Sequence, residues 1–170
     1  MLCGGTLIGE YYVLTAGHCV NDVRPENVLL FFGKNNLHSY NEGEVKRTVS
    51  KIILHPFYKL DPIFVPAPQN DIAILKLEKS VKMSKDIQPA CIAAHPGPRE
   101  GEKVKISGWG WTSPGVDRVS NVLKAAELEI LSWGKCDERV YKTEYTEFTK
   151  NMICATSDGK GGCHGDSGGL

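Results

Sequence analysis

The chain lacks a net charge, because 20 Lys and Arg residues balance 20 Asp and Glu residues among its 170 residues. An even balance gives no overall attraction to nucleic acid or to an anionic membrane. No apolar run approaches the roughly 18 residues that a membrane-spanning helix needs. We therefore expect neither a nucleic-acid partner nor a membrane anchor.

Zinc-type cysteine spacing is also lacking, although the chain has six cysteines. No CxxC pair occurs, and the adjacent Cys/His pairs at 18–19 and 163–164 do not have the spacing of common zinc sites. Six cysteines in a chain of this length are typical of a secreted, disulfide-stabilised protein, and their pairing is left open by sequence alone. We expect a secreted protein with no metal ion and no cofactor. No signal peptide is present, which indicates an incomplete chain.

Short segments rich in β-branched and aromatic residues dominate, bounded by Gly, Pro, Asn or Asp. Two strands surround a turn at Gly9 and Glu10. Further strands are predicted over residues 28–32, 49–54, 72–77, 103–107, 123–131 and 151–155. The apolar and charged residues of 123–131 also suit a helix, but the neighbouring segments favour a strand. One short helix is predicted over 135–141, and three prolines predict a surface loop over 61–68. The pattern indicates an all-β protein, either barrels or a sandwich.

A glycine-rich stretch near the C-terminal end holds a candidate nucleophile, Ser167, between Asp166 and Gly168. Such glycines allow a sharp turn that presents a hydroxyl while nearby N–H groups face an oxyanion. Taken alone, the stretch could equally be a surface turn. Serine becomes a strong nucleophile only when a base takes its proton and a third group orients that base.

His18 and Asp71 are the candidates for the base and for the group that orients it. His18 ends an apolar strand and is followed by Cys19, whereas His38, His55 and His95 lie in loop-like sequence. Asp71 opens an apolar run. Each could be an ordinary structural residue on its own.

The chain order of the three candidates supports a catalytic triad. His18, Asp71 and Ser167 follow one of the orders in which the Ser-His-Asp triad recurs. The α/β-hydrolase fold also uses G-x-S-x-G but places Asp and His after the serine, and only three residues follow Ser167. That fold is therefore excluded.

Three blocks resemble the signatures of the chymotrypsin-like (trypsin-fold) serine proteases: LTAGHC at 14–19, DIAIL at 71–75 and GDSGG at 165–169. CGGTLI at 3–8 and GWG at 108–110 resemble two further landmarks of the family. The resemblance implies an all-β fold of two antiparallel Greek-key β-barrels. It places the first barrel at 1–82, the connection between the barrels at 83–101 and a truncated second barrel at 102–170. The N-terminal strands and the end of the second barrel are expected to be missing.

The resemblance also implies a role for each site residue. Ser167 attacks the scissile carbonyl, His18 acts as base and then acid, and Asp71 orients His18. The N–H groups of Gly165 and Ser167 form the oxyanion hole. The expected function is serine endopeptidase activity through an acyl-enzyme, with protein or peptide substrates and serine protease inhibitors as partners. A non-catalytic homologue that binds or regulates is the alternative, and the complete triad argues against it.

Disulfide pairing is likewise implied by the resemblance. The expected bridges are Cys3–Cys19 and Cys136–Cys154. The usual partners of Cys91 and Cys163 lie in segments outside this chain, so these two cysteines are expected to be unpaired.

The predicted specificity pocket includes Gly161, Gly162 and His164. Trypsin-like members carry an aspartate where this chain has Gly161, so a substrate cation would be buried without a partner. We expect a preference for apolar residues at P1, the residue before the scissile bond, although some relatives supply an acid from the opposite wall.

Two further expectations concern calcium and activation. In relatives that bind calcium, acidic ligands lie in the loop that corresponds to 33–44. Here Lys34 replaces the first ligand, so an ion pair with Glu42 or Glu44 is expected instead of a calcium site. Relatives are activated when a new N-terminal amine, supplied by another segment of the precursor, pairs with the aspartate that corresponds to Asp166. Without that amine, Asp166 is expected to be unpaired and the polypeptide inactive.

Overall fold

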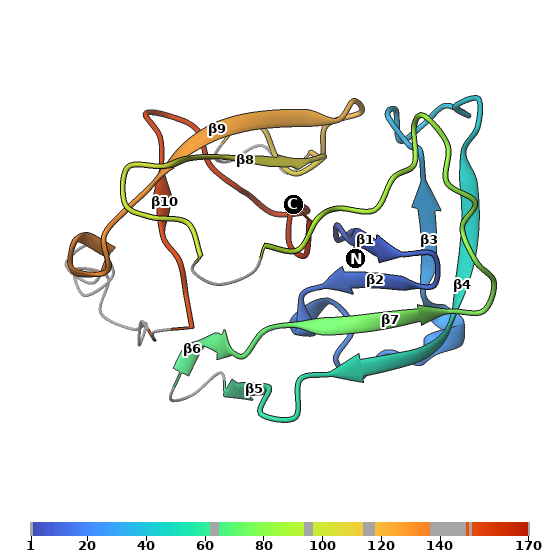
Figure 1. Cartoon of the computed structure of the whole chain (residues 1–170), viewed down its shortest axis with the longest axis horizontal. Helices are drawn as coiled ribbons and strands as arrows, with labels where there is room; N and C mark the ends of the chain where they lie inside the picture. Colours follow the sequence, from blue (N-terminus) through green and yellow to red (C-terminus); the bar gives the residue numbers. More distant parts are fainter. Residues whose placement is uncertain are drawn as a thin grey trace.

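The structure is a computed structural model that describes residues 2–61, 65–93, 97–113, 118–136, 149 and 151–169. Its strands form sheets of five, three and two strands. The five-stranded sheet lies on one side of the molecule and the three-stranded sheet on the other, and the two chain ends lie between them (Figure 1). The all-β class predicted from the sequence is confirmed.

The first sheet has the strand order β1-β2-β7-β4-β3, and every neighbouring pair is antiparallel. Its strands are β1 (Thr6–Gly9), β2 (Tyr12–Thr15), β3 (Leu29–Phe32), β4 (Val45–Leu54) and β7 (Ala73–Leu77). A turn at residues 10–11 joins β1 to β2, one residue later than the turn predicted at Gly9 and Glu10. Short 3₁₀ turns, η1 (Gly17–Cys19) and η2 (Pro25–Asn27), connect β2 to β3.

The core of the first sheet comes from the inward residues of its strands. In β7, Ala73, Leu75 and Leu77 are buried, whereas Lys76 is exposed. This alternation follows from the two-residue repeat of a strand, which sends successive side chains to opposite faces. Val13 and Val49 bury against the same cluster. The central strand β7 is thereby anchored, and Asp71 precedes it by two residues.

The second sheet consists of β8 (Lys103–Gly108), β9 (Lys124–Ile130) and β10 (Ala155–Thr156) in the order β10-β9-β8. The interpretation of 123–131 as a strand is confirmed, since β9 pairs with β8 from Lys124 to Glu129. The strand predicted over 151–155 is mostly wrong, because β10 starts only at Ala155. The Met152 N–H is used in a local turn with the Thr149 carbonyl at 3.0 Å.

The loop predicted over 61–68 is also wrong in part. β5 (Lys59–Asp61) and β6 (Val65–Gln69) pair as an antiparallel ribbon, and residues 62–64 lie outside the described part. Prolines are tolerated in β6 because each strand of a two-stranded ribbon has a free edge that needs no N–H donor.

Two predictions are tested less fully. Residues 133–136 are helical, and the rest of the helix predicted over 135–141 lies outside the described residues. The division into barrels at 1–82 and 102–170 stays a prediction. Among the described residues, no helix is long and apolar enough to cross a membrane.

The loop between β3 and β4 contains a lysine–glutamate ion pair. Lys34 Nζ lies 2.7 Å from Glu44 Oε2, and both side chains are largely shielded from solvent. Lys34 also donates to the Ser39 carbonyl at 3.0 Å. The bond from Lys34, helped by Asn41, lowers the pKa of Glu44 below its ordinary value of 4.5, although desolvation opposes the shift. A fixed cation therefore lies where a calcium ligand would be needed.

We expect millimolar calcium to leave the melting temperature unchanged, because a calcium site needs about six to eight oxygen ligands and repels an ammonium group. The Glu44 pair should stabilise the fold fully above about pH 4.5 and lose this effect as the pH falls through the lowered pKa of Glu44. Thermal unfolding of the wild type and Glu44→Gln, with and without calcium at pH 7 and pH 3, checks both points. A calcium-dependent rise in the melting temperature would contradict the first point. A Glu44→Gln variant whose melting temperature falls by the same amount at both pH values would contradict the second.

Candidate active site

His18 lies in η1, the tight turn that follows β2. The Val20 N–H donates to the Gly17 carbonyl at 3.0 Å and closes the turn. The next residue, Cys19, is joined by a disulfide to Cys3, which lies just before β1. The turn is therefore fastened on both sides of His18, once by the sheet and once by the disulfide.

Asp71 holds His18 through both of its carboxylate oxygens. Oδ1 accepts the His18 main-chain N–H at 2.7 Å, and Oδ2 lies 2.7 Å from Nδ1 of the ring. The His18 and Asp71 side chains are 32% and 24% exposed, so the pair is shielded but open to a ligand. A carboxylate at Nδ1 favours the tautomer with the proton on Nδ1 and leaves Nε2 to accept a proton.

The Tyr58 ring packs against Gly17 in the turn that contains His18, and this residue was not identified from the sequence. Its ring lies so close to Gly17 that a Cβ there would come within 2.8 Å of a ring carbon. The Tyr58 hydroxyl is buried and has no hydrogen-bond partner among the described residues. Burial, together with the negative charges of Asp71 and Asp22, raises the pKa of Tyr58. No sequence signal marks this residue, because it lies in an irregular segment after β4.

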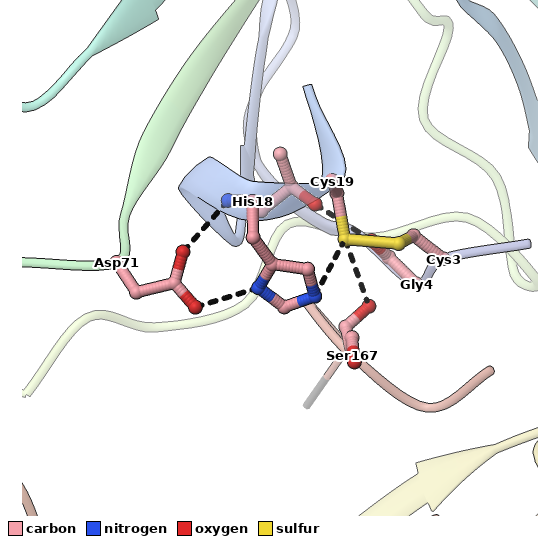
Figure 2. Close-up of a disulfide and its surroundings, with 7 residues drawn as sticks. Cys3, Gly4, His18, Cys19, Asp71 and Ser167 are labelled. Carbon is pink, nitrogen blue, oxygen red and sulfur yellow. Dashed lines mark hydrogen bonds and ion pairs between the residues drawn. A yellow bond between two sulfur atoms is a disulfide. The ribbon is translucent and has the colours of Figure 1, made fainter. Parts of the chain in front are cut away.

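Ser167 lies on the Nε2 side of the His18 ring, opposite Asp71 (Figure 2). The Gly4 N–H donates to the Ser167 carbonyl at 2.7 Å, and the Thr15 hydroxyl donates to the Gly4 carbonyl at 2.9 Å. His18 Nε2 contacts the Cys19 sulfur at 3.7 Å. Among the described residues, the Ser167 hydroxyl makes no hydrogen bond to Nε2; such bonds are often long in a free enzyme and tighten only with substrate.

The backbone around Ser167 adopts conformations that suit glycine. Gly165 and Gly168 have φ values of 96° and 79°. A Cβ at Gly168 would also come within 2.8 Å of the Ala16 nitrogen and the Gly4 oxygen, so this position lets the serine loop approach the His18 turn. In the described part of the chain, the Gly165 and Ser167 N–H groups donate to no other residue. Both are free to bind an oxyanion.

The Asp166 carboxylate accepts two main-chain hydrogen bonds that the sequence did not predict. Oδ1 accepts the Gly110 N–H at 2.7 Å, and Oδ2 accepts the Cys163 N–H at 3.0 Å. Gly110 belongs to the GWG landmark, whose glycines leave space for this carboxylate. Two main-chain donors satisfy the carboxylate, but no cation among the described residues neutralises it.

The predicted pocket residues lie on the same loop. The His164 and Trp111 rings are in contact, with 4.6 Å between their centroids. The main-chain N–H of Trp111 also donates to the main-chain carbonyl of His164 at 3.0 Å. Gly161 and Gly162 are exposed, and a Cβ at Gly161 would meet no atom within 4 Å. This stretch is open, and Trp111 is an addition to the residues identified from the sequence.

The structure links Cys3 to Cys19 and Cys136 to Cys154 as disulfides. Cys91 is exposed and Cys163 is half-buried, and neither takes part in a disulfide. Cys3, His18 and Cys19 have ligand atoms within 4.8 Å of one another. Because the two sulfurs are bonded to each other, neither is a thiolate that could bind a metal ion.

Comparisons with known proteins agree with this geometry. The Trypsin family model matches residues 1–169. The chain is 34% identical to Kallikrein-8 of Mus musculus, covering 99% of this chain and 61% of the relative. It is 36% identical to Venom serine protease 34 of Apis mellifera, covering 99% and 41%.

A solved structure shows the same fold. Neuropsin, a serine protease expressed in the limbic system of mouse brain, superposes with a TM-score of 0.84 at 34% identity, covering 99% of this chain and 70% of neuropsin. The chain thus spans about six tenths of the length of its kallikrein relative. The chain belongs to the trypsin family of serine proteases.

Proposed function

We propose that the protein is a serine endopeptidase that uses Ser167, His18 and Asp71. The observation that carries the proposal is the pair of hydrogen bonds between Asp71 and His18. Oδ1 lies 2.7 Å from the His18 main-chain nitrogen, and Oδ2 lies 2.7 Å from Nδ1. This geometry leaves Nε2 as the only ring nitrogen that can act on a substrate, and Ser167 lies on that side (Figure 2).

The reaction follows from these positions. His18 Nε2 takes the hydroxyl proton of Ser167 as the serine oxygen attacks the scissile carbonyl. The free N–H groups of Gly165 and Ser167 stabilise the oxyanion. Nε2 then gives its proton to the leaving amine, and an acyl-enzyme remains. A water molecule, deprotonated at Nε2, attacks the ester and releases the acid and the free serine.

We also propose a preference for apolar P1 residues. Gly161 supplies no carboxylate to the predicted pocket, and a lysine or arginine side chain buried there would lack a partner. The contact between His164 and Trp111 adds an aromatic surface beside the loop.

Aryl phosphonates that modify activated serines test both proposals. In a form of the protein extended at both ends to the length of its relatives, a probe with a phenylalanine-like side chain should label Ser167 at least about tenfold faster than a lysine-like probe, since an unpaired buried charge is costly. Ser167→Ala should abolish labelling. Faster labelling by the lysine-like probe would contradict the apolar preference, and no labelling by either probe would contradict the enzymatic function.

The alternative is a non-catalytic homologue that serves as a binding or regulatory module. Its favouring observation is that no hydrogen bond joins the Ser167 hydroxyl to His18 among the described residues. Loss of a triad member is typical of such homologues, and all three residues are present here. Phosphonate labelling of Ser167 separates the two functions.

We further propose that a polypeptide limited to residues 1–170 is inactive. Asp166 is bound only by main-chain N–H groups, and the family resemblance implies that an amine from another segment must neutralise it. Hydrolysis of an activated ester at protease-like rates by this polypeptide would overturn the proposal.

The proposed setting is extracellular, with protein or peptide substrates and protein inhibitors of serine proteases as partners. Two disulfides support this setting, because such bridges persist in oxidising compartments.

A further inference from the structure

Five exposed lysines lie along two neighbouring strands of the first sheet and the segment that follows one of them. We call this set the lysine strip: Lys46 and Lys51 in β4, Lys76 in β7, and Lys79 and Lys82 after β7. The whole chain carries no net charge, so the strip is a local concentration of positive charge on an otherwise balanced protein.

Pairing of the strands brings these lysines together. Lys51 is directly opposite Lys76 in the antiparallel register of β4 and β7. The Ser50 hydroxyl donates to the Lys76 carbonyl at 3.0 Å. Farther along β4, Arg47 Nε donates to the Ser80 carbonyl at 2.9 Å, which holds the segment with Lys79 and Lys82 beside the strand.

Among the described residues, no carboxylate forms an ion pair with a lysine of the strip. The Glu78 carboxylate accepts the Thr48 hydroxyl at 2.6 Å, and the Glu10 main chain accepts the Val81 N–H at 2.8 Å. In the described part of the chain, neither acid forms an ion pair with a lysine of the strip.

In the second sheet, by contrast, a lysine on one strand pairs with an acid on the next strand. There Lys103 pairs with Glu127 across β8 and β9 at 2.9 Å. Like charges directly opposite each other on adjacent strands are destabilising, so Lys51 and Lys76 oppose folding without a visible structural gain. Positions that break a local rule in this way are expected at functional surfaces.

We propose that the lysine strip binds a linear sulfated polysaccharide. The distance along β4 from Lys46 to Lys51 corresponds to about 17 Å of strand. Lys51 and Lys76 are directly opposite each other, so their Cβ atoms lie within a Debye length of about 8 Å. A polymer with repeated sulfates can contact all five ammonium groups at once. None of the five lysines lines the cavity beside β8 and β9 or the cavity that β1 and β3 line.

The test measures binding of size-defined heparin oligosaccharides to the 170-residue protein by calorimetry between 50 and 200 mM salt. We expect the affinity to fall steeply with salt, as counterions are released from the polyanion. Lys51→Ala with Lys76→Ala should weaken binding about tenfold or more. Lys103→Ala with Lys105→Ala, an equal change of charge on β8, should change binding less than about twofold.

Folding is checked by thermal unfolding of the free proteins. Lys51→Ala with Lys76→Ala should melt at the same temperature as the wild type or higher, because a repulsive pair is removed. Equal losses of binding in the two double variants, or no binding by the wild type, would overturn the proposal. Equally tight binding of duplex DNA or of a polyglutamate peptide of matched charge would also overturn it. None of these readouts depends on Ser167, so they are independent of the proposed proteolysis.

Discussion

Asp71→Asn is expected to lower kcat of the active enzyme by roughly four decades while the fold remains intact. Asp71 accepts the His18 main-chain N–H through Oδ1 and faces Nδ1 through Oδ2. An asparagine would keep the first bond through its oxygen and place an NH₂ group at Nδ1. This donor stabilises the tautomer with the proton on Nε2, which cannot accept the serine proton. Steady-state hydrolysis of a peptide ester measures the loss.

Asp22→Asn is the matched control for Asp71→Asn. Asp22 is a second carboxylate whose charge acts on Tyr58, but in the described part of the chain its side chain accepts a hydrogen bond only from its neighbour Asn21. Its φ of 59° is one that asparagine adopts readily. We expect this variant to retain kcat within about twofold, as is usual for surface changes. A loss below tenfold in Asp71→Asn would refute the assignment of Asp71 as the orienting group.

Replacing Cys3 and Cys19 together by alanine is expected to lower the free energy of unfolding by roughly 3 kcal/mol. The disulfide joins residues 16 apart in sequence, and its removal frees the unfolded chain to adopt more conformations. It also fastens the turn that carries His18, so kcat should fall as well. Urea unfolding monitored by tryptophan fluorescence measures the stability, and the melting temperature should drop by about 6–12 °C for a domain of this size.

Cys91→Ser provides the control, because Cys91 is exposed and belongs to neither disulfide. The midpoint urea concentration for unfolding of this variant should equal that of the wild type. A double alanine variant that loses less than about 1 kcal/mol would show that the Cys3–Cys19 bridge contributes little beyond the sheet contacts around it.

Local sequence predicted the strands where burial alternates strictly. In β7 the buried and exposed residues follow the two-residue repeat, and in β9 the same repeat separates Leu128 and Ile130 from Glu129. The prediction failed at residues 61, 65–68 and 151–154. In the first case the prolines lie on a ribbon with free edges, and in the second a local turn competes with the strand. Proline content and β propensity are local properties and do not reveal which edges are free.

The site residues show the same division. His18, Asp71 and Ser167 were identified because the blocks around them have a recognisable pattern. Tyr58 and Trp111 lie in irregular segments without such a pattern and were found only from their ring contacts with Gly17 and His164. The hydrogen bond between Asp166 and Gly110 was also missed, because its donor is a main-chain N–H group, which every residue except proline has.

The amino-acid sequence by itself determined the family, the all-β class and the identity of the triad candidates, because these depend on residue types in a given order. Only the tertiary structure decided that Asp71 binds His18 through both oxygens, that Asp166 accepts the Gly110 N–H and that Lys51 is opposite Lys76. These contacts join residues 25 or more positions apart. Their existence depends on strand register and on the closure of the sheets, which no short stretch of sequence specifies.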